Sequence, residues 1–471
     1  MHSMQELSAE PGITFDLAVI GSGPGGYEAA LRAAKAGMKV CIIEKAALGG
    51  VCINWGCIPT KALLRSAEVF DLFKKADSFG LKLQPGTIDL AEAVKRSRNV
   101  ALKMSKGVAF MLRRAGVDVR QGEAVFSTPH DLDIFRDGVR VDGVSARHII
   151  IASGAHPRAL PGLEPDGTRI ITSREALALK SVPASMIVVG GGAIGVEMAW
   201  FYAMAGSEVT LVELMPRLLP LEDEEIAEVL KRSLQKAGIT VVTSAKLESV
   251  SIEGDKVTAQ LVSEANDSQL LTADYLLVAV GVSANITGLG LENTGVETSR
   301  GFIVTDSVCR TSVSHIFAIG DVRGGMLLAH KASAEAVIAV HSIAGIPCHS
   351  LDDSLIPRCV YAEPSVASIG LSEKEAEDRG YKVRVGRSMF AASGKANAFG
   401  NLEGLVKLVF SAADGRLLGA HVVGHGAVEL IGELTLARRL SVTAEILAGT
   451  IHAHPTLSET IKEAAENALQ E

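Results

Sequence analysis

Two segments of this chain repeat one local design, and this repeat limits the folds available to the sequence more than any other feature. Each copy has a short apolar strand, a glycine-rich turn, a helix and a second apolar strand directly followed by glutamate. The second copy lies 169 residues after the first, so that Gly21 corresponds to Gly190 and Glu44 to Glu213. The predicted strands are 15–20, 39–43, 186–189 and 208–212. Strand, helix and strand in this order form a βαβ unit of a parallel sheet.

The glycine spacing within each turn is typical of a dinucleotide-binding site. The glycines are Gly21, Gly23 and Gly26 in the first copy and Gly190, Gly192 and Gly195 in the second. The first glycine of such a set allows a tight turn, the second lets backbone approach a pyrophosphate, and the third allows close helix–strand packing. The helix N-terminus offers free N–H groups to the phosphates. One set alone is weak evidence, but two complete sets indicate two bound dinucleotides.

An acidic residue closes each unit where a carboxylate binds the hydroxyls of a ribose. Glu44 takes this place in the first unit and Glu213 in the second. The carboxylate of Glu213 would repel the 2′-phosphate of NADP, and no arginine follows it before Arg217. The second site is therefore predicted to prefer NAD.

The overall composition excludes several classes of protein. The 471 residues exceed the roughly 250–300 at which a single core stops growing, which predicts two to four domains. A net charge of -8, without a stripe of Lys and Arg, argues against nucleic-acid binding. The apolar run 186–206 is about as long as a membrane span, but its glycines and Glu197 predict a strand, a turn and a buried helix. Without a signal or transit peptide, we expect a cytoplasmic protein that starts at Met1 or Met4.

Two of the six cysteines lie close together in a glycine-rich segment, Gly49-Gly-Val-Cys52-Ile-Asn-Trp-Gly56-Cys57. In a cysteine-poor chain without a secretion signal, such a pair is more typical of a redox centre than of a structural staple. Five residues of ideal helix span roughly 8 Å, beyond the ~7 Å limit for a disulfide, so a bridge requires an irregular turn. Lys61 lies one helical turn after Cys57, where a cation favours a thiolate. The alternative is two unpaired thiols in a packed turn.

The segment 49–61 resembles the active-site motif of the class I pyridine-nucleotide disulfide oxidoreductases, and the resemblance extends from about Phe15 to the C-terminus. It implies that the first glycine unit holds FAD, the second holds NAD, Cys57 faces the flavin and Cys52 exchanges with substrate. It also implies an ion pair between Lys61 and Glu197. The apolar neighbours of Glu197 in sequence support this pair independently, because an unpaired carboxylate would be costly there. A solvated Glu197 is the alternative.

Further segments resemble the family's other cofactor contacts, including a strand that runs into Gly320-Asp321, where the aspartate would bind the ribityl chain. The residues expected at FAD are Gly21, Gly23, Gly26, Glu44, Lys61, Ala124, Ala152, Ser153, Gly154, Asp321, Leu327 and His330. The residues expected at NAD are Gly190, Gly192, Gly195, Glu197, Glu213 and Gly281. The family often has arginine after the last glycine, where this chain has Val282, and this departure leaves the NAD affinity open. No metal site is expected.

The segment Thr450-Ile-His452-Ala-His454-Pro455-Thr-Leu-Ser-Glu459 resembles the C-terminal motif of family members that oxidise dihydrolipoamide. Exchange with a dithiol needs a base near neutral pH, and a carboxylate can fix the tautomer of such a histidine. The resemblance makes His454 the base and Glu459 its partner. His452 is the competing base, and two structural histidines are the other alternative. The resemblance also implies a homodimer in which this histidine reaches the neighbour's site.

The expected fold is α/β, with two Rossmann-like dinucleotide-binding domains for FAD and NAD plus an α+β C-terminal dimerisation domain. The expected domains are 1–156 for FAD, 157–283 for NAD, 284–352 as a central domain that completes the FAD site, and 353–471 as the interface domain. The expected substrate is dihydrolipoamide on the lipoyl domain of a 2-oxo acid dehydrogenase or glycine cleavage complex. Complexes that act on pyruvate, 2-oxoglutarate, branched-chain 2-oxo acids or glycine fit the sequence equally.

Three relatives and one unrelated class compete with this interpretation. Glutathione-type reductases prefer NADPH and would have basic residues after Glu213, where Leu214 and Met215 stand. Mercuric reductases have a C-terminal cysteine pair, and no cysteine follows Cys359 here. Soluble transhydrogenases lack the first cysteine pair. Four intact motif sets argue against a non-catalytic binding protein on this fold.

Overall fold

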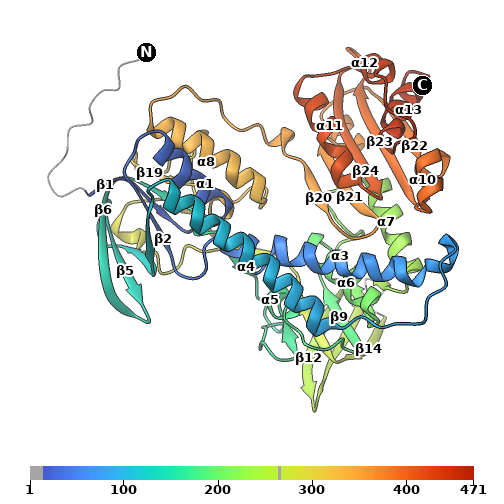
Figure 1. Cartoon of the computed structure of the whole chain (residues 1–471), viewed down its shortest axis with the longest axis horizontal. Helices are drawn as coiled ribbons and strands as arrows, with labels where there is room; N and C mark the ends of the chain where they lie inside the picture. The colour runs from blue at the N-terminus through green and yellow to red at the C-terminus, as the bar shows by residue number, and fades with distance from the viewer. Residues whose placement is uncertain (1–13, 264–266, 471) are drawn as a thin grey trace. The chain divides into compact units, whose positions relative to one another are not determined.

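The computed structural model of the chain describes residues 14–263 and 267–470, which form two compact units (Figure 1). The first unit combines residues 14–59 with 97–156 and 282–351. The second combines 60–96, 157–281 and the chain from 352 onward. Helix α3 (Cys57–Lys74) crosses from the first unit into the second, and α4 (Leu90–Arg114) crosses back. The division into four domains stays a prediction.

The first unit is built on a seven-stranded sheet in the order β3-β2-β1-β6-β5-β4, with β19 also paired to β6. β1, β2, β3, β19 and the end of β6 run parallel, whereas β4 and β5 are antiparallel to their neighbours. The strands are β1 (Phe15–Ile20), β2 (Val40–Glu44), β3 (Asp118–Gln121), β4 (Glu123–Phe126), β5 (Asp131–Arg136), β6 (Val139–Ile151) and β19 (Ile316–Ala318). Two short pairs complete the unit, β7 (Ala155–Pro157) with β16 (Val282–Ala284), and β17 (Thr298–Ser299) with β18 (Phe302–Ile303).

Alternate side chains of β1 enter two different cores of this unit. Leu17 and Val19 pack with α1 (Pro24–Lys35) and α8 (Ala329–Ile343), while Ala18 and Ile20 face the core behind β4 and β5. A strand covered on both faces is apolar throughout, as the sequence is here. The predicted strand 15–20 is confirmed in full, and the second strand ends at Glu44 itself, one residue beyond the prediction.

The second unit begins with a parallel sheet in the order β11-β10-β9-β15-β8, flanked by a three-stranded antiparallel sheet, β12-β13-β14. The strands are β8 (Ile170–Ile171), β9 (Ser185–Val189), β10 (Glu208–Val212), β11 (Thr240–Val242), β12 (Ala245–Glu253), β13 (Lys256–Ser263), β14 (Ser268–Ala273) and β15 (Tyr275–Val278). The helices are α5 (Ser173–Ala176), α6 (Ala193–Ala205) and α7 (Glu224–Lys236).

The apolar run that resembles a membrane span in length is β9, a glycine turn and α6. Eight consecutive residues of α6, from Gly195 to Tyr202, are buried, which explains why this helix is apolar all round. This confirms the predicted strand, turn and buried helix. Within residues 14–263 and 267–470, no helix combines the length and apolarity that crossing a membrane requires.

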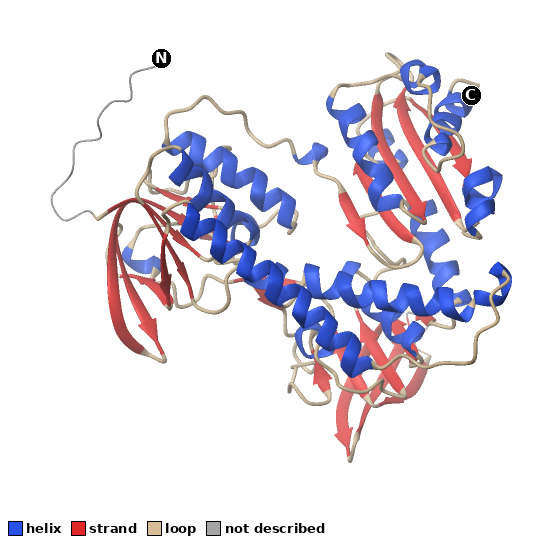
Figure 2. Cartoon of the chain, viewed as in Figure 1, coloured by secondary structure: helices blue, strands red, loops and turns tan. Residues whose placement is uncertain are grey.

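The C-terminal part of the second unit is a five-stranded antiparallel sheet with helices packed against it (Figure 2). The sheet order is β20 (Arg358–Val360), β21 (Ser365–Gly370), β24 (Leu417–Gly424), β23 (Gly404–Ser411) and β22 (Val383–Met389). The helices are α9 (Glu373–Asp378), α10 (Gly394–Phe399), α11 (Ala427–Arg439), α12 (Ala444–Gly449) and α13 (Glu459–Ala468). β23 and β24 lie on either side of the Asp414–Gly415 turn and pair with each other. The fold class is therefore the predicted α/β with an α+β C-terminal part.

A buried lysine connects this sheet to the start of α7 within the second unit. Lys407 of β23 is 3% exposed, and its Nζ lies 3.0 Å from Asp223, 2.5 Å from Glu225 and 2.8 Å from Glu373. Burial alone would lower the pKa of Lys407, but its hydrogen bonds to Glu225, Glu373 and Asp223 outweigh burial and raise the pKa. Asp223 is also the N-cap of α7, so the lysine fixes the beginning of that helix.

Three histidines come together in the first unit. The rings of His130 and His315 stack with their centroids 3.8 Å apart, and His148 of β6 has a buried Nδ1 without a hydrogen-bond partner among the described residues. Burial lowers the pKa of His148 to about 4, with a further contribution from His315. His148 is therefore neutral in the folded protein at pH 5, where a free histidine is protonated.

Replacing His148 with glutamine is expected to remove part of the acid sensitivity of folding. Between its ordinary pKa of 6.5 and the folded value of about 4, the unfolded chain binds a proton that the folded chain does not. The stability contributed by neutral His148 is complete above pH 6.5 and is lost as the pH falls toward 4. The measurement is urea unfolding at pH 7 and pH 5. The midpoint should fall less in His148→Gln than in the native protein and in an exposed control, His349→Gln. Equal falls in all three proteins would contradict this assignment.

Candidate active site

The first glycine turn has room for a ligand at one of its three glycines and none at the other two. A Cβ on Gly21, which has a φ of +94°, would lie 2.4 Å from the carbonyl oxygen of Ala152. A Cβ on Gly26 would lie 1.9 Å from the carbonyl oxygen of Gly21. A Cβ on Gly23 would meet nothing within 4 Å. Packing therefore requires the first and third glycines, and the second faces open space where a pyrophosphate can approach.

The second turn has the same geometry. A Cβ on Gly190, at φ +106°, would lie 2.4 Å from the carbonyl oxygen of Ala279, and one on Gly195 would lie 1.8 Å from that of Gly190. A Cβ on Gly192 would again meet nothing within 4 Å. The helices α1 and α6 begin directly after these turns, with Gly23 and Gly192 as their N-caps. Both sites therefore combine open space with free N–H groups, which fits a dinucleotide phosphate.

The two glutamates are held in the same way at their own turns. Glu44 Oε2 accepts the N–H of Ser22 at 2.9 Å, and Oε1 accepts the N–H of Ala46 at 2.8 Å. Glu213 Oε2 accepts the N–H of Gly191 at 2.5 Å, and Oε1 accepts that of Met215 at 2.7 Å. Each carboxylate keeps lone pairs for further donors. These fixed acceptors beside the glycine turns suit ribose hydroxyls.

Asp321 lies in η3 (Gly320–Arg323), on a turn that a buried glutamate organises. Glu335 of α8 is fully buried, and its carboxylate accepts the N–H of Gly320 at 2.7 Å and contacts Arg323 and Lys331 at 2.6 Å. Burial raises the pKa of Asp321, whose carboxylate has no hydrogen-bond partner among the residues that the structure describes. A half-buried acceptor without a donor fits a hydroxyl-rich ligand such as the ribityl chain. Sequence reasoning missed Glu335, because nothing in its spacing marks it.

The other residues expected near FAD occupy varied positions in the first unit. Ala152 donates its N–H to Ile20 at 2.8 Å, and Ser153 Oγ donates to the carbonyl of Asn285 at 2.8 Å. Gly154 has a φ of +72° in the same segment. Ala124 is buried in β4, Leu327 is half-buried and His330 is exposed. Gly281, which is expected at NAD and belongs to the second unit, has a φ of +106° and open space beside it.

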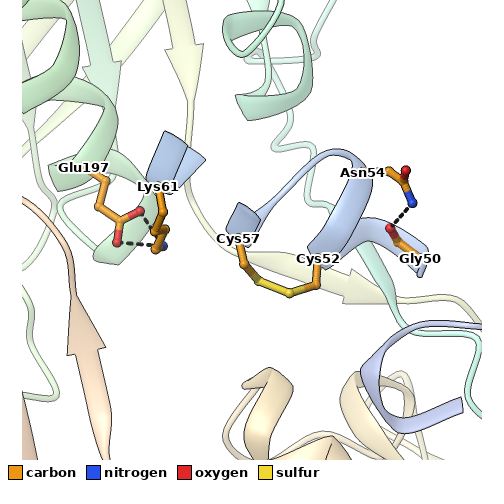
Figure 3. The surroundings of a disulfide bond; sticks show 6 residues. All are labelled: Gly50, Cys52, Asn54, Cys57, Lys61 and Glu197. Carbon is orange, nitrogen blue, oxygen red and sulfur yellow. Dashed lines mark hydrogen bonds and ion pairs between the residues drawn. A yellow bond between two sulfur atoms is a disulfide. The ribbon is translucent and has the colours of Figure 1, made fainter. Parts of the chain in front are cut away.

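The cysteine pair forms a disulfide in a broken helix (Figure 3). Cys52 lies in α2 (Gly50–Asn54) and Cys57 begins α3, with their Cα atoms 4.7 Å apart. The break at Trp55 and Gly56 supplies the irregular turn that the spacing requires, so the predicted redox pair is bridged. Asn54, which sequence reasoning missed, donates to the carbonyl oxygens of Leu48 and Gly50 at 3.0 Å and holds this turn together.

The cysteine segment also rests on the first glycine turn. The N–H of Gly49 lies 3.1 Å from both the carbonyl oxygen and the Oγ of Ser22. A Cβ on Gly50 would lie 2.7 Å from the Cα of Gly23. The disulfide is therefore fixed to the loop that is expected to bind the flavin pyrophosphate.

Lys61 and Glu197 form an ion pair inside the second unit (Figure 3). Lys61 Nζ lies 2.9 and 3.1 Å from the carboxylate oxygens of Glu197, whose side chain is 5% exposed. Glu197 also accepts the N–H of Tyr361 at 3.0 Å, and Lys61 Nζ lies 4.4 Å from the centre of the Tyr361 ring. The contact arises because α3 and α6 share one apolar core. Tyr361 was not predicted, since nothing local in the sequence connects it to Glu197.

The two C-terminal histidines occupy opposite environments. His454 Nδ1 lies 2.9 Å from Glu459 Oε1, while 79% of its side chain is exposed. Its Nε2 makes no hydrogen bond to any described residue, so it is available to a substrate. The N–H of Thr456, and then the ring of His454, hold the pKa of Glu459 below its usual value. His452 is 6% exposed and both of its nitrogens are engaged, which favours His454 as the base.

The predicted catalytic residues are divided between the two units. Cys52 and Cys57 belong to the first, whereas Lys61, Glu197 and the His454–Glu459 pair belong to the second. Among residues 14–263 and 267–470, no cluster of three or more His, Cys, Asp or Glu side chains is arranged to hold a metal ion.

Comparison with known proteins gives long matches. Residues 15–336 match the pyridine nucleotide-disulphide oxidoreductase family, and residues 356–465 match the dimerisation domain of that family. A dihydrolipoyl dehydrogenase of Chlorobaculum tepidum is 65% identical over 456 residues, 97% of each chain. One from Rhizobium etli is 46% identical over 97% of this chain and 98% of its own. The crystal structure of LpdA from Mycobacterium tuberculosis is similar with a TM-score of 0.89 at 30% identity, over 96% of this chain and 99% of that one.

Substitution of Lys61 by methionine is expected to destabilise the protein by roughly 1–3 kcal/mol, because it leaves the buried carboxylate of Glu197 without its cation. The expected loss is below the about 3–5 kcal/mol typical of fully buried pairs, since a third of the lysine side chain is exposed. The matched control is Lys95→Met, which breaks the exposed pair with Glu92 and should leave the stability almost unchanged. Urea unfolding at pH 7 measures both. Equal losses would show that the Lys61–Glu197 pair behaves like a surface pair.

Proposed function

The chain belongs to the pyridine nucleotide-disulphide oxidoreductase family, and we propose that it catalyses the dihydrolipoyl dehydrogenase reaction, in which dihydrolipoamide is oxidised to lipoamide and NAD is reduced. The observation that carries the proposal is the Cys52–Cys57 disulfide held on a dinucleotide-binding turn. The His454–Glu459 pair supplies the base that a dithiol substrate requires. Glutathione-type, mercuric and transhydrogenase relatives are less well supported, since the dihydrolipoyl dehydrogenases match over nearly the whole chain.

The cysteine chemistry follows from the groups that the chain supplies. His454 Nε2 takes a proton from one thiol of dihydrolipoamide, and the resulting thiolate attacks Cys52 Sγ, which breaks the Cys52–Cys57 bond. The second substrate thiol then displaces Cys52 and closes the lipoamide disulfide. The protein is left with a Cys52 thiol and a Cys57 thiolate, reduced by two electrons. Bound at the first glycine turn, FAD would supply the acceptor for this electron pair, and NAD at the second turn would supply the final hydride acceptor.

The remaining groups would bind the two cofactors or stabilise negative charge near the disulfide. The glycines of the first turn, Glu44 and Asp321 would bind FAD, and the glycines of the second turn with Glu213 would bind NAD. Lys61 stabilises negative charge close to its helix N-terminus, and Glu197 fixes the position of Lys61. The other cofactor contacts expected from the sequence are part of the same proposal.

The match to the family's dimerisation domain indicates a homodimer. We further propose that His454 serves the disulfide of the partner subunit, so that a monomer is inactive. The electron donor is a lipoyl domain of a 2-oxo acid dehydrogenase or glycine cleavage complex. A cytoplasmic location fits a pair of thiols that must cycle between reduced and oxidised forms.

The first test is the NADH-dependent reduction of lipoamide by the purified protein, with NADPH and glutathione disulfide assayed in parallel. NADH with lipoamide should be the fast pair, because Glu213 disfavours the NADP phosphate. Cys52→Ser should abolish turnover, and His454→Gln should lower kcat about 10²- to 10⁴-fold. The exposed control His349→Gln should match the native protein.

Reduction of ferricyanide by NADH should survive both active-site substitutions, because this acceptor takes electrons from the reduced flavin without disulfide exchange. Turnover of glutathione disulfide with NADPH, but not of lipoamide with NADH, would overturn the substrate assignment and keep the family.

A further inference from the structure

His452 is the anchor of the segment that carries the proposed base. Of the six residues from Thr450 to Pro455, it alone is not exposed, with 6% of its side chain accessible. Ile451 is 95% exposed, so its apolar side chain is not packed against the rest of the chain. Apolar packing therefore contributes little to the conformation of this segment, which rests on hydrogen bonds. Thr450 Oγ1 donates to the carbonyl of Ile446 and Thr456 Oγ1 to that of Ala453, both at 2.7 Å, and His452 connects the segment to α11.

Both ring nitrogens of His452 face hydrogen-bond acceptors. Nδ1 lies 3.1 Å from the carbonyl oxygen of Thr450, and Nε2 lies 2.9 Å from Oε1 of Glu433 in α11. The ring of His452 therefore lies between a backbone carbonyl of its own segment and a carboxylate of α11.

We infer that His452 is a positioning residue, which pairs with Glu433 and holds His454 in the orientation needed to deprotonate the dithiol. The inference rests on the proposed function and assigns a role to a histidine–glutamate pair other than the one at the base. The base, His454, is fixed by Glu459 of α13, and the segment that carries it is fixed by Glu433 of α11. Two helices therefore hold the segment, one through each histidine.

The geometry explains why such an anchor matters for rate. A general base must lie within hydrogen-bond reach of the proton that it removes, and an error of about 1 Å can cost a hundredfold in rate. Glu459 orients the ring of His454 and accepts the N–H of Thr456, which follows the segment. The half-buried, charge-assisted contact between His452 and Glu433, at 2.9 Å, ties the segment itself to α11.

The test compares His452→Gln, Glu433→Leu and Glu433→Gln in the full-length, FAD-loaded protein. Glu466→Gln is the control, because it changes a carboxylate in α13 that forms only a surface pair with Lys462. Each of the three variants should lower the kcat for lipoamide about tenfold to a hundredfold. The rate of NADH–ferricyanide turnover, which needs no base, should stay within twofold of the native rate. The control should leave both rates unchanged.

Two further results test the charge and the pairing. Glu433→Gln keeps an acceptor oxygen but replaces the charge-assisted bond to a carboxylate with a weaker neutral one, so it should still lower kcat. The double variant His452→Gln/Glu433→Leu should lose no more activity than the worse single variant, because both remove one contact.

Several outcomes would overturn the inference: an unchanged kcat in His452→Gln, a parallel loss of lipoamide and ferricyanide turnover, additive losses in the double variant, or a harmless Glu433→Gln. Failure of the proposed function gives a different result, since the native protein itself would then not reduce lipoamide. Native turnover with a fully active His452→Gln variant would reject only the role of His452.

Discussion

Contact between glycine backbones is the constraint on which the first unit depends. The helix after β1 can begin only because Gly26 lies against the carbonyl of Gly21, where a Cβ would come within 1.9 Å. The cysteine segment can rest on the same turn only because Gly50 lies against Gly23, where a Cβ would come within 2.7 Å. One loop therefore leaves space for a dinucleotide and also carries the disulfide. The position of Cys52 and Cys57 is determined more by these glycines than by the cysteines themselves.

Buried ion pairs play the corresponding part in the second unit. Glu197 has Lys61 and the N–H of Tyr361, while Lys407 has three carboxylates. Such pairs add little to stability compared with apolar packing, because removing the charges from water is costly. They do restrict geometry, since a displaced partner leaves an uncompensated charge. Lys407 fixes the start of α7, and Lys61 fixes the carboxylate of Glu197 in α6. Ion pairs therefore help to position both helices of the proposed NAD-binding part.

The parts of the fold that repeat or alternate locally could be predicted from the sequence. The βαβ units, the buried helix after Gly192 and the bridged cysteine pair all follow from spacing within a few tens of residues. The contacts that escaped prediction join residues on separate elements of the chain. Glu433 lies 19 residues from His452, and Tyr361 lies 164 residues from Glu197. No local period marks such partners, because their pairing depends on how the sheets and helices pack, which only the folded chain determines.

His452 and His454 show the same limit at the smallest scale. They are the same residue type, two positions apart, in a segment without apolar anchors. A period-2 alternation sends one side chain into the protein and the other outward, but the sequence does not say which. Glu433 determines which ring is buried, because α11 places its carboxylate 2.9 Å from the ring of His452. His454 is left 79% exposed, with one nitrogen held by Glu459 and the other free. The exposure that makes His454 suitable as a base is thus a consequence of the burial of its neighbour.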